Sequence, residues 1–140
     1  MIGILLITHG TLGDSLILCA SHVLNKRPPR LRQLGIPAQD DPLLLLPQAR
    51  KLVRELDEGD GVLILSDIYG GSPANIAGKL LIPGKVEGVA GVNLPMLIRV
   101  LTYRDRSLQT IVTKAVSGGC DGVVRIPVPA LVVNNAATGS

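Results

Sequence analysis

The chain opens with MIGILLITHG, residues 1–10, in which an almost unbroken apolar run ends in Thr8-His9-Gly10. Continuous apolar runs of this length are typical of strands that are buried on both faces of a parallel sheet. We therefore predict a buried strand over residues 1–8. This strand would carry the polar His9 to the carboxyl edge of the sheet.

The residues that follow predict a helix, a weak strand and a second helix. Apolar residues recur at helical spacing over 13–25, and residues 31–36 are polar enough for a strand at a sheet edge. Asp40 or Asp41 with Pro42 is a helix-start signal for a segment that runs to Leu56. Because Pro47 lies inside this segment, we expect the helix to be kinked or to start late.

The second half of the chain repeats the alternation of strands and helices. Ser72-Pro73 predicts a helix start, with Ser72 as the N-cap. The full set of predicted elements is a strand at 62–66, a helix at 72–81, a strand at 86–91, helices at 93–103 and 107–117, and a last strand at 122–126. We expect one domain over residues 1–130 and a polar tail over 131–140.

This alternation predicts an α/β fold with a mostly parallel sheet. For about five strands in 140 residues, the natural candidate is a flavodoxin-like three-layer sandwich with strand order 2-1-3-4-5. In such sheets ligands bind where the winding direction reverses, outside the carboxyl ends of strands one and three. The residues that leave those two ends are His9 and Asp67.

An imidazole beside a carboxylate can act as a nucleophile at neutral pH. A neutral His9 would present a lone pair, and Asp67 would accept a hydrogen bond from the other ring nitrogen and fix the tautomer. The simpler interpretation of a lone histidine is a structural or capping residue, and Asp67 could also serve as a turn residue. Their shared position at the switch point favours the catalytic interpretation.

The loop after Asp67 is typical of an anion site. Gly70 and Gly71 allow a tight turn, and Ser72 starts a helix whose free N–H groups favour an anion. Gly10 removes side-chain bulk next to His9. We therefore predict that Gly10, Gly70, Gly71 and Ser72 surround a phosphoryl group on His9, without a metal or another cofactor.

Composition excludes several classes of protein. Hydrophobic residues make up 46% of the chain, which has no Trp or Phe, so the core must be aliphatic. No apolar stretch is long enough to span a membrane, and no secretory signal is visible. The free thiols of Cys19 and Cys120 suit a reducing cytoplasm. The net charge of +3 comes mainly from residues 26–32. This segment could be a docking patch for an anionic partner or a solvated loop. It has no aromatic residues to stack on bases, which argues against nucleic-acid binding and favours the solvated loop.

Three other functions fit the same scaffold. A flavin-dependent electron carrier usually needs aromatic residues around the ring, and this chain has only two tyrosines. A receiver domain needs acidic residues at the end of the first strand, where this chain has His9. A pure binding or regulatory module stays open. Ser66 and Ser72 do not predict a hydrolase, because the exposed nucleophile turn of that class is absent.

Three motifs together resemble the mannose-type enzyme IIA family of the bacterial phosphotransferase system. They are Thr8-His9-Gly10, the run from Asp67 to Asn75, and Gly91-Val92-Asn93-Leu94-Pro95-Met96-Leu97. The resemblance spans about residues 1–126. The chain departs from the family at Ala74, where an aromatic residue is common, and at Tyr69, where Trp or Phe is usual.

This resemblance implies a cytoplasmic phosphotransferase that carries a phosphoryl group on His9, with Asp67 as its hydrogen-bonded partner. It implies the protein HPr as donor and a IIB protein or domain as acceptor, without membrane insertion. It also implies a homodimer in which the last strand, expected to be antiparallel, is exchanged between subunits. The alternative is a free-standing regulatory phosphorylation sensor with no role in sugar transport, and the sugar itself cannot be named.

Overall fold

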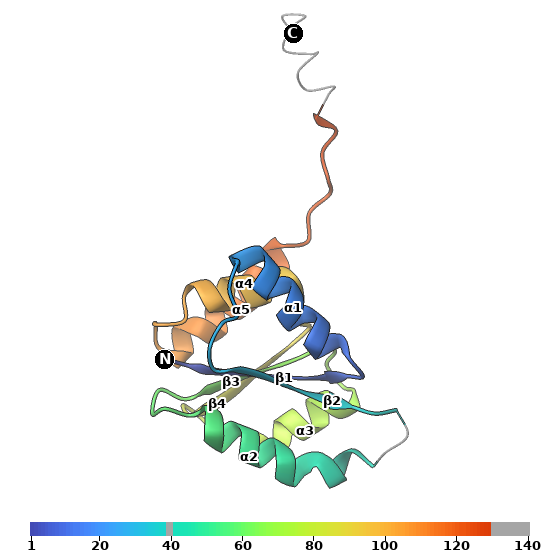
Figure 1. Ribbon diagram of the computed structural model, residues 1–140, viewed down its shortest axis with the longest axis vertical. Coiled ribbons are helices and arrows are strands. Elements are labelled where there is room, and N and C mark those ends of the chain that lie inside the picture. Colours follow the sequence, from blue (N-terminus) through green and yellow to red (C-terminus); the bar gives the residue numbers. More distant parts are fainter. Residues whose placement is uncertain (39–40, 130–140) are drawn as a thin grey trace, which may run out of the picture.

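A four-stranded parallel sheet lies between two layers of helices in the computed structural model, which describes residues 1–38 and 41–129 (Figure 1). The strand order is β2-β1-β3-β4. This confirms the α/β class and the predicted order of the first four strands. The strands are β1 (Gly3–His9), β2 (Leu31–Ile36), β3 (Val62–Ser66) and β4 (Val86–Ala90).

The helices divide between the two faces of the sheet. In Figure 1, α1, α4 and α5 cover one face, and α2 and α3 cover the other. Their bounds are α1 (Leu12–Leu24), a short 3₁₀ helix η1 (Pro42–Leu45), α2 (Leu46–Leu56), α3 (Ser72–Leu80), α4 (Leu94–Thr102) and α5 (Leu108–Asp121). None of the helices in the described ranges has both the length and the hydropathy needed to cross a bilayer.

The predicted helix over residues 42–56 is divided at its proline. Asp41 caps η1 by accepting the N–H of Leu43 at 3.0 Å, and α2 then starts at Leu46 with Pro47 in its first turn. A proline is tolerated there because its missing N–H would have no partner inside the helix. Helix α2 therefore starts late, as Pro47 predicted.

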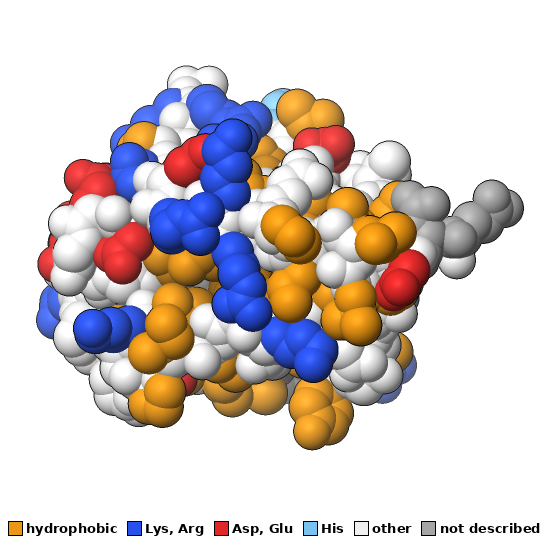
Figure 2. Space-filling view, turned by 90° about the horizontal axis from the view of Figure 1, so that it is seen from below, with side chains coloured by type: hydrophobic (Ala, Val, Ile, Leu, Met, Phe, Trp, Pro, Cys, Tyr) orange, Lys and Arg blue, Asp and Glu red, His pale blue; other side chains and the backbone are white. Residues whose placement is uncertain are grey.

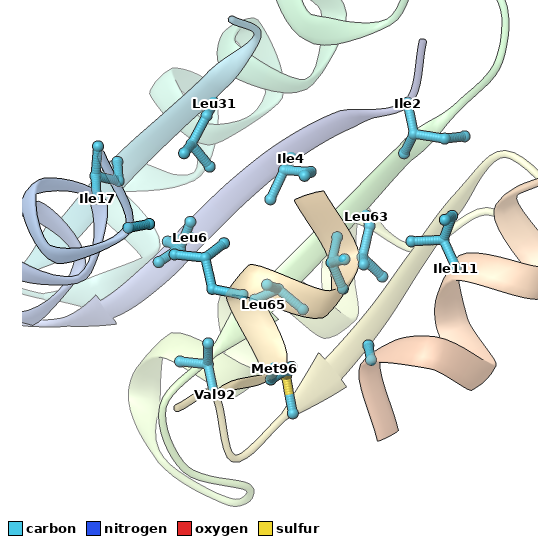
Figure 3. Packing of buried hydrophobic residues seen from close by; sticks show 14 of the residues in the cluster. Ile2, Ile4, Leu6, Ile17, Leu31, Leu63, Leu65, Val92, Met96 and Ile111 are labelled. Carbon is cyan, nitrogen blue, oxygen red and sulfur yellow. The ribbon is translucent and has the colours of Figure 1, made fainter. Parts of the chain in front are cut away.

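Alternating residues of β1 build two separate cores. Ile4 and Leu6 belong to the cluster under α1, α4 and α5, whereas Leu5 and Ile7 belong to the cluster under α2 and α3. All four side chains are fully buried, and each buried aliphatic side chain stabilises the fold by about 1.5–3 kcal/mol. Figure 3 shows the first cluster, in which side chains from β1 and β3 meet those of the helices above them.

Parallel pairing of β1 with β3 fixes the edge at which the predicted site forms. The two strands are in register from Gly3 opposite Val62 to Ile7 opposite Ser66. Because both strands run in the same direction, His9 and Asp67 leave the sheet at the same edge.

The predicted fifth strand at 122–126 is absent from the described part of the chain. α5 continues to Asp121, beyond its predicted end at residue 117. Residues 123–128 then run away from the sheet without regular structure, as an extended segment (Figure 1). A strand needs a partner for its backbone hydrogen bonds, and this segment pairs with no described strand. The predicted tail over 131–140 lies outside the described residues.

The predicted N-cap of α3 is also wrong. Gly71, in an extended conformation, occupies the N-cap position of α3, and Ser72 is already the first helical residue.

Arg104, between α4 and α5, is buried at 5% exposure, which is rare for an arginine. Its guanidinium donates hydrogen bonds to the carbonyl oxygens of Ile2, Pro29 and Arg30, which ties the start of β1 to the turn before β2.

Candidate functional site

The imidazole of His9 and the carboxylate of Asp67 are in direct contact at the carboxyl edge of the sheet. His9 is the last residue of β1, and Asp67 directly follows β3. Nδ1 of His9 lies 2.8 Å from Oδ2 of Asp67, and the backbone N–H of His9 donates to the same oxygen at 3.0 Å. The His9 side chain is 52% exposed and that of Asp67 only 12%.

Hydrogen bonds keep Asp67 ionised. Partial burial alone would raise the pKa of its carboxyl group, but the N–H and the ring of His9 and the N–H after Asp67 hold the pKa below its ordinary value. An ionised carboxylate only accepts hydrogen bonds. Nδ1 of His9 therefore carries the proton in the neutral ring, and Nε2 keeps its lone pair.

The free nitrogen of His9 lies against the turn before α3. A Cβ atom added at Gly71 would lie 3.1 Å from Cε1 and 3.5 Å from Nε2 of His9. Gly70 adopts φ +90°, a conformation that disfavours any residue with a side chain. These two glycines let the backbone pass close to the ring and turn into the helix.

The first turn of α3 offers N–H groups at this position. No side chain caps the helix at Gly71, so its first amides stay open to an anion, apart from Pro73, which has no N–H. The structure thus brings Gly71 beside His9, and Ser72 follows it as the first residue of α3. Gly10 follows His9 with φ +52° and no atom near the position of a Cβ, which leaves the approach to the ring open.

Residues that the sequence analysis did not single out hold this turn in place. The hydroxyl of the buried Thr8 accepts the N–H of Gly13 at 2.9 Å, which fixes the turn from β1 into α1. A Cβ at Gly35 of β2 would lie 2.2 Å from the carbonyl oxygen of Gly10. The sequence could have indicated this contact, because an isolated glycine inside a strand often marks a close approach of two backbone segments.

Asn93 of the third motif and the chain's second histidine, His22, are not part of the site. The side chain of Asn93 accepts the N–H of Met96 at 2.9 Å and donates to the carbonyl of Gly119 at 3.1 Å, so it caps α4. His22 lies in the last turn of α1, exposed and away from the edge where His9 lies. The described residues contain no group of three or more acidic, His or Cys side chains arranged to hold a metal.

Exposed apolar side chains border the site. Tyr69 is 89% exposed, and Ile68 and Leu12 are also exposed. A groove of about 610 Å³ lies beside Tyr69 and Ser72 and runs between η1 and α3. An exposed reactive ring with an apolar border suits a protein partner better than a small molecule enclosed in a cavity.

Comparison with known proteins gives consistent similarities. A family model described as "PTS system fructose IIA component" matches residues 3–116. The mannose-specific EIIAB component of Escherichia coli K12 is 33% identical over 129 residues, which are 87% of this chain and 38% of that protein. The fructose-specific EIIA component of Bacillus subtilis is 39% identical over 54 residues, 38% of this chain and 37% of that protein.

Solved structures share the fold. The mannose/sorbose-specific IIA subunit from Enterococcus faecalis superposes with a TM-score of 0.81 at 20% identity, covering 91% of this chain and 96% of that one. The PTS IIA protein of a fucose utilization operon from Streptococcus pneumoniae gives a TM-score of 0.76 at 25% identity, covering 88% and 91%. At these identities the similarity establishes the architecture.

Proposed function

Because the chain belongs to the family of phosphotransferase system IIA components of the fructose and mannose type, we propose that it is a phosphocarrier that takes a phosphoryl group onto Nε2 of His9. The contact between Nδ1 of His9 and Asp67 carries this proposal. It leaves Nε2 unprotonated and directed at the open amides of α3.

The proposed donor is phosphorylated HPr, and the proposed acceptor is a IIB protein or domain. In the first step Nε2 of His9 attacks the phosphorus atom in line, the bond from phosphorus to the donor's leaving nitrogen breaks, and that nitrogen keeps the electron pair. The Nδ1 proton of His9 stays in its hydrogen bond to Asp67, which stabilises the cationic ring. The second step repeats this exchange with the acceptor.

Charge stabilisation and positioning would supply the catalysis. Phosphoryl transfer passes through a loose transition state with charge on the peripheral oxygens. The first-turn amides of α3, next to Gly70, Gly71 and Ser72, would donate hydrogen bonds to those oxygens, while Gly10 gives the partner access. The partner, docked on the border around Tyr69, would exclude water during contact.

The proposal also includes a cytoplasmic homodimer that exchanges its C-terminal segment. The outer edge of β4 bonds to Ile82 at Val86 and pairs with no described strand beyond it. Val123, Val124 and Ile126 form an extended apolar segment, each at least 70% exposed. Pairing of this segment with β4 of a second copy would bury both. The chain spans 38% of the length of its mannose-specific relatives, so their other activities are not transferred to it.

Phosphorylation with enzyme I, HPr and labelled phosphoenolpyruvate tests this function. We expect label on the wild type and on His22→Ala, and none on His9→Ala. His22 is the matched control because it is the chain's other histidine. The label should be acid-labile and alkali-stable, and ¹⁵N NMR should place it on Nε2. Label retained by His9→Ala, or transferred to no IIB acceptor, would contradict the carrier proposal.

A further inference from the structure

A band of basic side chains crosses the outer face of α2 and α3. Figure 2 shows Lys and Arg side chains running diagonally over this face, with apolar side chains on both sides. Helix α2 contributes Arg50, Lys51 and Arg54, and α3 contributes Lys79. All four residues are exposed, and none belongs to the site at His9. We call these four residues the basic band.

Most of the basic band has no counter-charge among the described residues. Lys51 approaches Glu55 at 3.9 Å, and Glu55 also faces Arg32 at 3.6 Å. The other three members form no ion pair within the described ranges. The face therefore carries a net positive potential, which adjoins Arg32 of the basic segment at 26–32.

Apolar side chains project from the same face. Leu43 of η1 is 53% exposed, and Ile82 after α3 is 52% exposed. Arg50 and Arg54 line one hollow together with Ile82, and Lys79 lines the groove that contains Leu43. Cations and projecting aliphatic side chains are thus interspersed on one surface.

We propose that this face adsorbs to an anionic lipid bilayer, with the basic band on headgroup phosphates and Leu43 and Ile82 at the acyl boundary. Surfaces that combine cations with projecting apolar residues bind membranes in this way. The basic band is spread over two helices, and its members line two separate hollows, so it suits mobile lipids better than the fixed carboxylates of one protein. The strands run parallel to this face, so His9 stays accessible at the sheet edge.

Sedimentation of the 140-residue chain with vesicles tests the proposal. The protein is mixed with vesicles of phosphatidylcholine alone, or of phosphatidylcholine with phosphatidylglycerol, at physiological salt. We expect binding only to the anionic vesicles. Each lost cation should weaken partitioning about fivefold, so the double variant Arg50→Gln/Arg54→Gln should bind about 25-fold more weakly. Leu43→Ser should also weaken binding.

A matched double variant distinguishes the effect of this face from the effect of the protein's net charge. Arg106→Gln/Lys114→Gln removes the same charge from the α4 and α5 side of the molecule and should bind nearly as the wild type does. If both double variants lost vesicle binding equally, or if the wild type did not bind anionic vesicles, the proposal would be overturned. Binding to polyglutamate without binding to vesicles would also overturn it and would assign the face to an acidic polypeptide. None of these outcomes depends on phosphorylation of His9.

Discussion

Nδ1 of His9 and the backbone N–H of the same residue both bond to Oδ2 of Asp67, at 2.8 and 3.0 Å. One carboxylate oxygen therefore fixes both the strand end and the ring. This double contact sets the tautomer and the direction of Nε2. In the proposed function Asp67 is therefore a positioning residue, and its removal should affect the rate of transfer more than the fold.

Asp67→Asn should slow phosphorylation of His9 about 10²-fold, because an amide can stabilise either tautomer and does not stabilise the cationic ring. Rapid-quench measurement of single-turnover transfer from phosphorylated HPr would give the rate. The ¹⁵N shifts of the His9 ring would report the tautomer directly. An unchanged rate with an unchanged Nδ1–H tautomer would show that Asp67 has no part in transfer.

Acid should remove the stability that Asp67 contributes. Its pKa in the folded state lies below the ordinary value, which is about 3.9 in an unfolded chain. The contribution is therefore complete above about pH 4 and disappears as the pH falls through the lower folded-state pKa. The difference in unfolding free energy between wild type and Asp67→Asn, measured with urea, should shrink on acidification. A constant difference down to pH 2 would be inconsistent with this linkage.

The sequence was informative where local pattern and topology agree. The apolar runs at β1 and β3 placed both strands, and the winding rule for parallel sheets then placed His9 beside Asp67. Close backbone contacts are different, because they depend on which segments meet in space. β2 passes so close to the turn after β1 that a Cβ at Gly35 would lie 2.2 Å from the carbonyl oxygen of Gly10. The isolated glycine in the strand signals a close approach, but it does not identify which segment comes close.

Arg104 and the last predicted strand show two further limits. Arg104 and Arg106 flank Asp105 and look equivalent in sequence. Only Arg104 turns inward, because three carbonyl groups converge on it. The β-branched run after Gly122 has the composition of a strand, but composition does not supply a pairing partner. The burial of Arg104 and the missing strand both depend on hydrogen-bond partners that lie in other segments of the chain.

Gly71→Ala should reduce the rate of transfer at least tenfold while the protein stays folded. The new methyl group would lie 3.1 Å from Cε1 of His9, so the ring would have to move away from the amides of α3, and small displacements of reacting groups are costly. Gly78→Ala in the same helix is the control, since no atom lies within 4 Å of that Cβ position. It should transfer normally and gain about 0.5–1 kcal/mol of stability. Equal transfer rates for the two variants would refute the steric argument.

Arg104→Met should destabilise the fold by about 2–4 kcal/mol, because the carbonyl groups of Ile2, Pro29 and Arg30 would lose their shared donor. Burial, and then the nearby Arg30, lower the pKa of Arg104 to about 10, so the guanidinium is still charged at neutral pH. Urea unfolding followed by circular dichroism measures the loss. Arg106→Met, at an exposed neighbouring position, should change the unfolding free energy by less than about 0.5 kcal/mol. Similar losses in both variants would argue against the carbonyl cluster as the cause.

Removal of residues 123–140 should convert the proposed dimer into a monomer, whereas removal of 130–140 alone should leave it intact. The first deletion takes away Val123, Val124 and Ile126, whose side chains are 79%, 70% and 87% exposed in the single chain. An apolar segment of this kind gains stability only if something covers it, and the outer edge of β4 offers backbone groups that need partners. Light scattering coupled to size-exclusion chromatography would give the mass of each form over a range of micromolar concentrations. A monomeric wild type, or a dimer that survives the longer deletion, would show that this segment does not hold two copies together.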